Sequence, residues 1–372
     1  MKKAFTKVIS LVLALLLLSA AIVPVSASVH EKPTLRFRED GSFTILQFTD
    51  TQDTHLPSPN MLSLLQRAMD EVKPDLVVFT GDQIKNYDSD FDGGGQNWKS
   101  KLTLHHILKP VVRRGIPFVL TFGNHDAWFD DFTREDQLEY VNRYKGCLLV
   151  DEAPEVSGCG NCCLQILSGK SDKPAFNLFF MDSNQSVVEA DQIAWYIGRS
   201  QELQAANDGE IIPAIEFQHI IPHNGQLLEA FAERGDVFAS FFGHNHHRSD
   251  KIVKNGIDLY YTPTSGFYEF GPDRDRGARV IKIFEDNPRE LETYVLTFND
   301  LFEDNPITDL RYAFFTVFEF DNMSAFEIIK KVLTLTGKAA GYFMISTKGK
   351  PFEMAVELLD FIGFDTGFYF NG

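Results

Sequence analysis

Carboxylate, amide and imidazole side chains follow the ends of several apolar segments in this sequence, where they could bind metal ions together. The longest group is Gly123-Asn124-His125-Asp126, which follows the apolar residues 116–122. Shorter groups have the same character: Asp50 with Gln52, Asp82, His219, and His244 with His246. Oxygen and nitrogen ligands without thiolates are typical of Mn, Fe or Zn sites. Two such ions about 3.5–4 Å apart would clamp the attacking and leaving oxygens of a displacement and activate a water molecule.

The segments that carry these residues have the composition of buried strands. Strands are expected over residues 43–49, 75–80, 116–122, 212–217 and 237–242, each ending at one of the polar groups. Helices are expected over residues 59–72 and about 98–114, the second interrupted by Pro110 and ended by Gly115. One histidine after a strand is usually structural, but a series of such strand ends is difficult to explain by packing. The order of elements predicts an α/β fold whose strand ends converge on one site.

Size and charge narrow the class of protein. The chain has 372 residues and a formal net charge of −17, with 44% apolar and 23% charged residues. This composition is that of a globular protein with two domains, or with one large domain and an appendage. A protein that neutralises phosphates of nucleic acid should be basic, so no nucleic acid binding is expected. An acidic enzyme for phosphorylated substrates needs a local positive centre, which metal ions would supply.

Residues 1–27 have the features of a secretory signal peptide. Three lysines precede an apolar region centred on residues 11–18, and Val25-Ser26-Ala27 fits a small-x-small cleavage pattern. An uncleaved anchor is the alternative, because the apolar run is nearly long enough to span a bilayer. We therefore expect a secreted protein, extracellular or associated with the cell envelope, with no stable membrane anchor after cleavage.

Two further patterns have simple structural interpretations. Disulfides or buried thiols are expected at the four cysteines, Cys147, Cys159, Cys162 and Cys163. Residues 159–162 have the spacing of half a zinc site, but no second pair follows them. Residues 88–93 match the first half of an EF-hand calcium loop, but Lys99 stands where the closing glutamate should be, so a solvated loop is preferred.

The order and spacing of the polar groups over residues 43–284 resemble the calcineurin-like metallophosphoesterase family, in its branch of purple-acid-phosphatase-like proteins. The motifs that carry this resemblance are Asp50-x-Gln52, Gly81-Asp82, Gly123-Asn124-His125-Asp126, Phe217-Gln218-His219 and Gly243-His244-Asn245-His246. The resemblance implies a four-layer αββα sandwich for the α/β domain, over residues 35–297. It also implies two divalent metal ions (Mn, Fe or Zn) and hydrolysis of phosphate esters by in-line attack of a metal-bound hydroxide.

The same resemblance divides the candidate ligands between two ions. The first ion would be bound by Asp50 and His246, with Gln52 as a further candidate ligand. The second ion would be bound by Asn124, His219 and His244, with Asp82 bridging both. His125 would lie near the phosphoryl group, stabilise developing charge and protonate the leaving oxygen. Asp126 would orient His125.

Two positions depart from the family pattern. The family usually has a histidine where this chain has Gln52, whose amide oxygen is a weaker ligand; nearby His55 is a minor alternative. Purple acid phosphatases have a tyrosine three residues after the bridging aspartate, where this chain has Lys85. The first ion is therefore expected to be held more loosely, and no tyrosinate–iron colour is expected.

These features together predict a secreted hydrolase for small-molecule phosphate esters, with phosphomonoesters favoured. A phosphodiesterase is one alternative, because the ligand motifs do not encode that choice. A non-catalytic protein that binds metal and phosphate on the same fold is the other. Gln52 argues for the non-catalytic protein, whereas His125 argues against it, because a binding protein has no need of a leaving-group acid.

The resemblance ends after residue 284, and residues 308–372 are expected to form a small C-terminal α+β extension of unknown role. A strand is expected over residues 312–320, then a helix that Ser324 caps and Gly337 ends. A second strand is expected over residues 340–346 and a second helix over residues 351–361. The extension contains no histidine or cysteine, so no chemistry is assigned to it.

Overall fold

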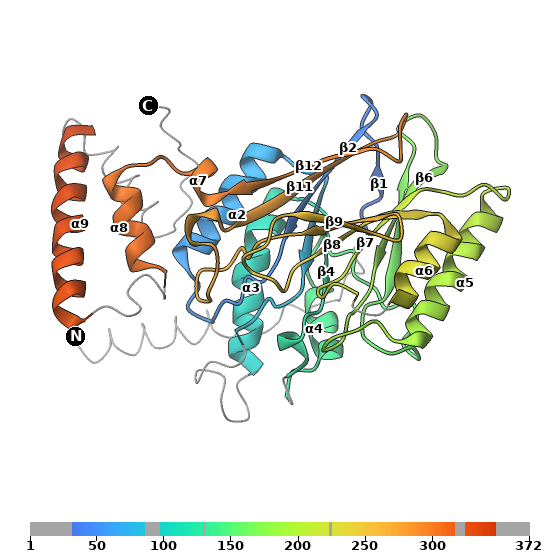
Figure 1. The fold of residues 1–372 in the computed structure, drawn as a ribbon, viewed down its shortest axis with the longest axis horizontal. Coiled ribbons are helices and arrows are strands. Elements are labelled where there is room, and N and C mark those ends of the chain that lie inside the picture. Colours follow the sequence, from blue (N-terminus) through green and yellow to red (C-terminus); the bar gives the residue numbers. More distant parts are fainter. Residues whose placement is uncertain (1–31, 86–96, 129–130, 223–224, 317–323, 347–372) are drawn as a thin grey trace, which may run out of the picture. The chain divides into compact units, whose positions relative to one another are not determined.

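Two β-sheets form the centre of the structure. The computed structural model describes residues 32–85, 97–128, 131–222, 225–316 and 324–346. One sheet has the order β12-β11-β2-β3-β4 and the other the order β1-β5-β6-β7-β8-β10-β9 (Figure 1). The strands of the smaller sheet are β2 (Ser42–Phe48), β3 (Leu76–Thr80), β4 (Phe118–Thr121), β11 (Gly277–Phe284) and β12 (Leu291–Thr297). Those of the larger sheet are β1 (Leu35–Arg36), β5 (Cys162–Leu167), β6 (Pro174–Phe180), β7 (Ala214–Phe217), β8 (Val237–Phe242), β9 (Lys251–Lys254) and β10 (Ile257–Tyr261).

The central strands of each sheet are parallel, which brings their carboxyl ends to one edge. In the smaller sheet β2, β3 and β4 are parallel to one another. In the larger sheet β6, β7, β8 and β10 are parallel, with β9 added antiparallel at the edge. Every strand predicted to end at a polar group is present: β2, β3, β4, β7 and β8. The structure therefore confirms the strands that carry the candidate site.

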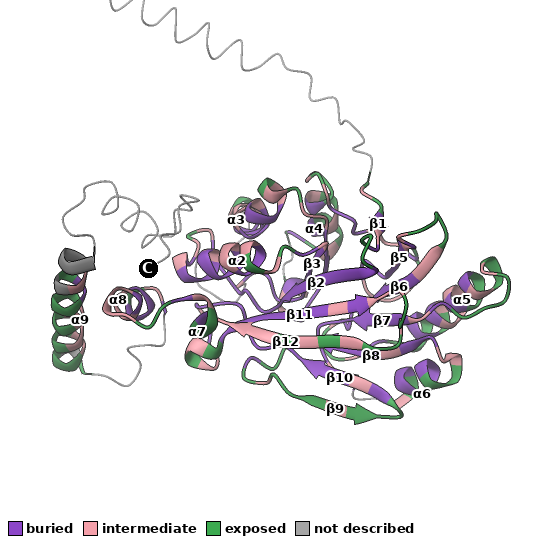
Figure 2. Cartoon of the chain, turned by 90° about the horizontal axis from the view of Figure 1, so that it is seen from above, coloured by how far each residue is buried: buried purple, intermediate pink, exposed green. Residues whose placement is uncertain are grey.

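Helices cover the outer faces of the two sheets. The helices α2 (Pro59–Val72) and α3 (Asn97–Arg114) lie on one side, and α5 (Ala190–Ala206) and α6 (Gly225–Arg234) lie on the other (Figure 2). A short helix, α4 (Arg134–Val141), follows the β4 loop. One cluster of buried apolar side chains joins both sheets with α2 and α3, and a second lies under α5 and α6. This order of layers confirms the predicted αββα sandwich.

Local sequence explains the boundaries of the first helices. The side chain of Ser58 caps α2 by accepting the N–H of Met61, and Pro59 occupies a first-turn position where no amide donor is needed. The helix α3 ends before Gly115, whose φ of +67° closes it. Pro110 was expected to interrupt this helix, but α3 is continuous through it. The proline removes one backbone donor, and its neighbours Leu108 and Val111 remain buried in the core.

The C-terminal part is helical where the structure describes it, and both strands predicted there are wrong in their described residues. Residues 312–314 belong to α8 (Pro306–Phe314), and residues 340–346 belong to α9 (Ala325–Ser346). Asn305 caps α8 by accepting the N–H groups of Ile307 and Thr308, a start signal that strand propensity further along had obscured. A short helix, α7 (Phe298–Leu301), follows β12.

The helix α9 begins as predicted but does not end as predicted. Ser324 and Glu327 form reciprocal hydrogen bonds at its first turn. Gly337 was expected to end the helix, but it lies inside α9. α9 lies beside α8 (Figures 1 and 2). The helix predicted over residues 351–361 falls outside the described residues.

The remaining sequence predictions concern the signal segment, the acidic loop, the cysteines and membrane-spanning segments. The signal segment 1–27 and the acidic loop 88–93 lie outside the described residues. All four cysteines are buried, and burial raises the pKa of Cys163 well above its ordinary value. Among the described helices, none combines the length and the apolar character needed to cross a bilayer.

Candidate metal centre

The loops that follow the five central strands meet at one edge of the two sheets. Backbone hydrogen bonds join the loops in pairs: Asp50 N–H to the Gly81 carbonyl at 3.1 Å, and Gly243 N–H to the His219 carbonyl at 3.0 Å. The two sheets are connected through His244, whose backbone N–H donates to Asp50 Oδ2 at 2.8 Å. These bonds bring residues from widely separated parts of the chain into one cluster.

The backbone of this cluster is strained. Four of the candidate ligands have left-handed backbone conformations, with φ of +49° at Asp50, +35° at Gln52, +53° at Asp82 and +64° at His244. Non-glycine residues rarely adopt this conformation, and such residues concentrate at functional sites. The loops also approach very closely, because a Cβ on Gly123 would lie 2.1 Å from Asp82 Oδ1. Glycine at position 123 is therefore required for the approach of two site loops.

Two buried histidines face two carboxylates across the centre. His219 Nε2 lies 3.2 Å from Asp82 Oδ2 and 3.9 Å from Asp50 Oδ1. His246 Nε2 lies 3.2 Å from Asp50 Oδ1. The exposed His244 completes a group with Asp82 and His219 whose ligand atoms all lie within 4.8 Å of one another. A search of the described residues for histidine, cysteine, aspartate and glutamate side chains spaced to hold a metal ion finds this group.

The outer nitrogens of both histidines are already bonded to backbone carbonyls. His219 Nδ1 lies 2.7 Å from the Thr80 carbonyl, and His246 Nδ1 lies 2.7 Å from the Phe270 carbonyl. A carbonyl accepts only from a protonated nitrogen, so a neutral ring directs the lone pair of Nε2 at the carboxylates. Lone pairs and carboxylates repel each other unless a cation lies between them. The donor set therefore fits metal ions, which would bind at Nε2 of each ring.

Other buried ligand atoms in the centre also lack hydrogen-bond partners. Gln52 Oε1 and Asn124 Oδ1 are buried and make no hydrogen bond. Gln52 is instead linked through Nε2 to Asp82 Oδ2 at 3.4 Å. Buried polar atoms are normally hydrogen-bonded, so unpartnered oxygens at this place are consistent with ligands of a metal ion. His55, the alternative to Gln52, has its ring edge-on against Trp98 at 5.7 Å.

The pKa values reflect the same charges. Burial alone would raise the pKa of Asp50, but His219 and His246 lower it below its ordinary value. Burial alone would lower the pKa of His219, but the carboxylates of Asp82 and Asp50 raise it to about 10. The pKa of His246 is raised in the same way, with burial opposed chiefly by Asp50. The centre thus stabilises positive charge strongly, as a cation-binding site must.

His125 lies beside the candidate ligands and is more accessible than Asp50, Asp82, His219 and His246, although less so than the exposed His244. Its side chain is 18% exposed, and Nε2 lies 3.8 Å from Asp82 Oδ2. The backbone N–H of His125 donates to Asp82 Oδ1 at 2.9 Å, which fixes the start of the following turn. The Trp128 ring packs against the imidazole, with ring centroids 4.3 Å apart. This position leaves the imidazole available to a bound substrate.

Asp126 contacts the backbone and not the ring of His125. Its buried carboxylate accepts the N–H groups of Asp82 at 2.7 Å, Gly123 at 2.9 Å and Gln83 at 3.2 Å. Burial and the nearby Asp82 raise its pKa to about 7. Asp126 thus joins the β3 and β4 loops beneath the candidate ligands, and its expected role in orienting His125 stays a prediction.

Sequence reasoning missed the groups that support the ligands from outside. The carbonyls of Thr80 and Phe270 hold the two buried histidines, but a backbone acceptor leaves no trace in residue type. Lys85 was noted only as a departure from the family, and it pairs with Glu269 at 3.3 Å. No role is predicted for Arg276 from the sequence, because its burial becomes visible only in the structure. Arginine is almost never fully buried unless it is paired, and the partners here are again backbone carbonyls.

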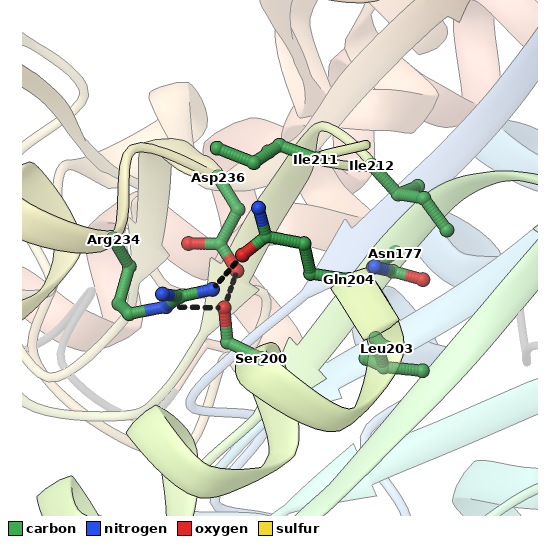
Figure 3. Close-up of a pocket in the computed structure, with 8 residues that line it drawn as sticks. All are labelled: Asn177, Ser200, Leu203, Gln204, Ile211, Ile212, Arg234 and Asp236. Atoms are coloured by element: carbon green, nitrogen blue, oxygen red, sulfur yellow. Dashed lines mark hydrogen bonds between the residues drawn. The ribbon is translucent and has the colours of Figure 1, made fainter. Parts of the chain in front are cut away.

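A small polar depression lies elsewhere, between α5, α6 and the larger sheet (Figure 3). Arg234 Nε donates to Ser200 Oγ at 3.0 Å, and Ser200 Oγ donates to Asp236 Oδ2 at 2.6 Å (Figure 3). Arg234 also donates to Gln204 Oε1 at 2.7 Å. Because these polar groups satisfy one another, the depression is explained by packing between helices and sheet.

Several known proteins are similar to this chain. A family model described as calcineurin-like phosphoesterase matches residues 43–248. "Probable inactive purple acid phosphatase 14" of Arabidopsis thaliana is 27% identical, over 70% of this chain and 79% of that protein. "Probable inactive purple acid phosphatase 29" of the same plant is 26% identical, over 70% of this chain and 81% of that protein. A solved dimetal phosphatase from Danio rerio is 12% identical, with a TM-score of 0.47, over 69% of this chain and 99% of that one.

Proposed function

Because this chain belongs to the calcineurin-like phosphoesterase family, we propose that it is a secreted phosphoesterase that uses two divalent metal ions and prefers phosphate monoesters. The proposal rests on one observation above all. The Nε2 atoms of His219 and His246 point at the carboxylates of Asp82 and Asp50, while both Nδ1 atoms are bonded to carbonyls. With neutral rings, such an arrangement needs a cation between each Nε2 and the carboxylate it faces; in the absence of a metal ion, a proton on Nε2 takes that place.

Each side of the centre would hold one ion. Asp50, Gln52 and His246 would bind the first ion, Asn124, His219 and His244 the second, and Asp82 would bridge them. A pair of bound divalent ions would supply Lewis acidity toward the phosphoryl oxygens and a nucleophilic water at neutral pH. The protein's own contribution is to fix the ligands on strained, closely packed loops, so that the centre does not reorganise when substrate binds.

His125 is proposed as the group that acts on the leaving oxygen. Its ring packs against Trp128 and lies near Asp82, and its side chain remains 18% exposed beside the candidate ligands. A neutral or protonated imidazole there can hydrogen-bond to the phosphoryl group and donate a proton to the departing alkoxide. The fixed start of its turn at Asp82 Oδ1 keeps the ring next to the centre.

The experiment uses the full mature protein, stripped of metal and reconstituted with Mn, Fe, Zn or Mg. Turnover of p-nitrophenyl phosphate is compared with turnover of bis(p-nitrophenyl) phosphate. We expect hydrolysis with at least one metal, and a higher kcat/KM for the monoester. A higher kcat/KM for the diester would replace the monoesterase proposal with a phosphodiesterase. Metal content measured on the same samples shows whether the centre is filled.

A second candidate function is a non-catalytic protein that binds metal and phosphate. Two observations favour it: the Arabidopsis relatives are named as probably inactive, and Gln52 stands where the family usually has a histidine. In the same assay this candidate predicts a filled dinuclear centre without turnover for any metal. The retained His125 supports the enzyme, because a binding protein gains nothing from a leaving-group acid.

Secretion is proposed from residues 1–27 alone. The basic start, apolar region and small-residue cleavage pattern are those of a signal peptide. N-terminal sequencing of protein recovered from the medium of expressing cells tests this directly. A chain that begins near residue 28 is expected, whereas an intact N-terminus in the membrane fraction would indicate an uncleaved anchor.

A further inference from the structure

Residues 266–270 form a loop that holds His246 from the side opposite the metal ligands. The Phe270 carbonyl lies 2.7 Å from His246 Nδ1. The Phe270 ring stacks on the imidazole, with centroids 4.3 Å apart and an interplanar angle of 22°. One residue therefore sets both the tautomer of His246 and the plane of its ring.

The other end of this loop lies against the strand end that carries Asp50. A Cβ on Gly266 would lie 2.3 Å from the Thr51 carbonyl oxygen and 2.6 Å from the Asp50 carbonyl oxygen. The Thr264 hydroxyl, just before the loop, donates to the Asp50 carbonyl at 2.7 Å. The loop thus touches two of the proposed protein ligands of the first ion, Asp50 and His246.

Two cationic side chains hold the loop in place. Arg276 is 2% exposed, and its guanidinium donates to the carbonyls of Gly266 and, at 2.7 Å, Glu269. Lys85 Nζ donates to the Tyr268 carbonyl at 2.8 Å and lies 3.3 Å from a carboxylate oxygen of Glu269. The side chains of Lys85 and Glu269 are only 12% and 10% exposed. Nearly every carbonyl of the loop is therefore engaged by a buried cation or by His246.

Buried cations are a poor source of stability, because desolvation offsets most of what their hydrogen bonds contribute. The presence of two buried cations against one short loop is better explained if they fix the geometry of that loop. The rigid fork of arginine suits two carbonyls on the same loop, and a lysine reaches a third from the β3 side. Lys85 occupies the position, three residues after Asp82, where purple acid phosphatases have a tyrosine.

We propose that Arg276 and Lys85 are positioning residues that hold the loop 266–270 so that His246 is aimed at the first metal ion; this inference rests on the proposed function. The first ion depends on this support more than the second does. Its ligands include one imidazole, His246, beside the weaker amide Gln52, whereas the second ion has both His219 and His244. A small rotation of His246 therefore weakens the first ion selectively.

The test measures metal binding and not turnover. Metal-free full-length mature protein is titrated with Co²⁺, following heat and the visible absorption of the bound ion. We compare wild type with Lys85→Met and Arg276→Lys. Arg279→Lys is the matched control. Arg279, on β11, is also a buried arginine, but its hydrogen bonds go to residues outside the loop 266–270: Ser249, Tyr261, Thr262 and Thr293. Thermal unfolding of each metal-free variant shows whether it is folded.

The expected result is a 10–100-fold weaker affinity for one of the two ions in Lys85→Met and Arg276→Lys, as found for residues that orient metal ligands. The other ion should bind as in wild type, and Arg279→Lys should bind both ions normally. If Arg276→Lys fails to fold, Lys85→Met alone decides. Two ions bound with wild-type affinity, or an equal weakening of both, would overturn the positioning role. Absence of Co²⁺ binding in wild type would instead overturn the proposed function itself.

Discussion

The two sides of the candidate metal centre contain similar candidate ligands but are supported very differently. On the Asp82 side, His219 is fully buried, its Nδ1 is held by the Thr80 carbonyl at the end of β3 in the other sheet, and the carboxylate of Asp126 joins the loops beneath. On the Asp50 side, His246 depends on a separate loop, which two long cationic side chains hold. A ligand held by a strand is fixed by the fold itself, whereas a ligand held by a loop needs added contacts.

The largest effect is expected at the residue that both sides share. Asp82→Asn keeps the size of the side chain but removes the charge that faces His219, so both ions should be lost. We expect kcat/KM to fall by about 10³-fold or more, since metal ions supply several kcal/mol of transition-state stabilisation. Metal analysis and p-nitrophenyl phosphate hydrolysis measure both effects, with the surface variant Asp250→Asn as control. Retention of one tightly bound ion would show that the two sides are independent.

The next effect separates catalysis from metal binding on the Asp82 side. His125→Ala removes the proposed proton donor and leaves every proposed ligand in place. We expect both ions to remain and kcat to fall by about 10²–10⁴-fold, the range for general acid catalysis. His105→Ala is the control, since His105 lies on α3 and its Nδ1 is 2.9 Å from the Tyr144 hydroxyl. A near wild-type rate would mean that another group protonates the leaving oxygen.

A smaller effect in the opposite direction tests the weaker side. Gln52→His restores the imidazole that the family usually has, so the Asp50 side should bind its ion about tenfold more tightly. The gain should be larger for Zn²⁺ than for Mg²⁺, because imidazole prefers softer ions. Competition titrations with a chelator measure the change. Unaltered affinity for both metals would indicate that residue 52 does not bind the ion.

The last effect is on folding stability and not on metal binding or turnover, and it concerns a buried carboxylate that faces no imidazole. Glu216 on β7 is fully buried, one of its oxygens accepts the Ser240 hydroxyl and the other has no partner. Burial raises its pKa from 4.5 to about 8, in contrast to Asp50. Between these two pH values the unfolded chain ionises Glu216 while the folded chain keeps it protonated. The free energy of unfolding should therefore fall with rising pH, by up to about 1.4 kcal/mol per unit.

Glu216→Gln should remove the contribution of this group to the pH dependence. The difference in the free energy of unfolding between pH 5 and pH 8, measured with urea, should therefore be smaller than in wild type. The exposed Glu210→Gln serves as the matched control and should leave the wild-type slope unchanged. An unchanged slope in Glu216→Gln would mean that the folded protein accommodates the ionised carboxylate. The pair Asp50 and Glu216 would then not differ in the way their surroundings suggest.

The parts of the molecule that sequence predicted are those that local pattern determines. Apolar strands such as β8 and polar residues directly after them, such as His244, are encoded within a few positions. The contacts of Asp126 with the N–H groups of Asp82 and Gln83 could not be predicted, because they depend on how two loops approach in space. The same holds for Arg276, whose partners are carbonyl oxygens that any residue type provides.

The tail shows the opposite failure, in which local composition misled. Aromatic and β-branched residues from Tyr312 onward favour a strand, yet Asn305 and Pro306 start a helix that includes Tyr312. Arg311 in that helix donates to the Pro59 carbonyl at 2.8 Å and to Asn60 Oδ1 at 3.0 Å, which ties α8 to α2. Capping and tertiary contacts therefore outweighed strand propensity.

The left-handed backbone at Asp50, Gln52, Asp82 and His244 has a consequence for how such proteins diverge. Each of these residues holds a conformation that costs of the order of 1 kcal/mol and that glycine adopts freely. A substitution by glycine there removes a ligand and also relieves strain, which offsets part of the cost of the hydrogen bonds that the side chain made. Selection for folding alone therefore protects this centre only weakly. Lineages released from selection for activity are expected to lose metal ligands early while keeping the sandwich intact.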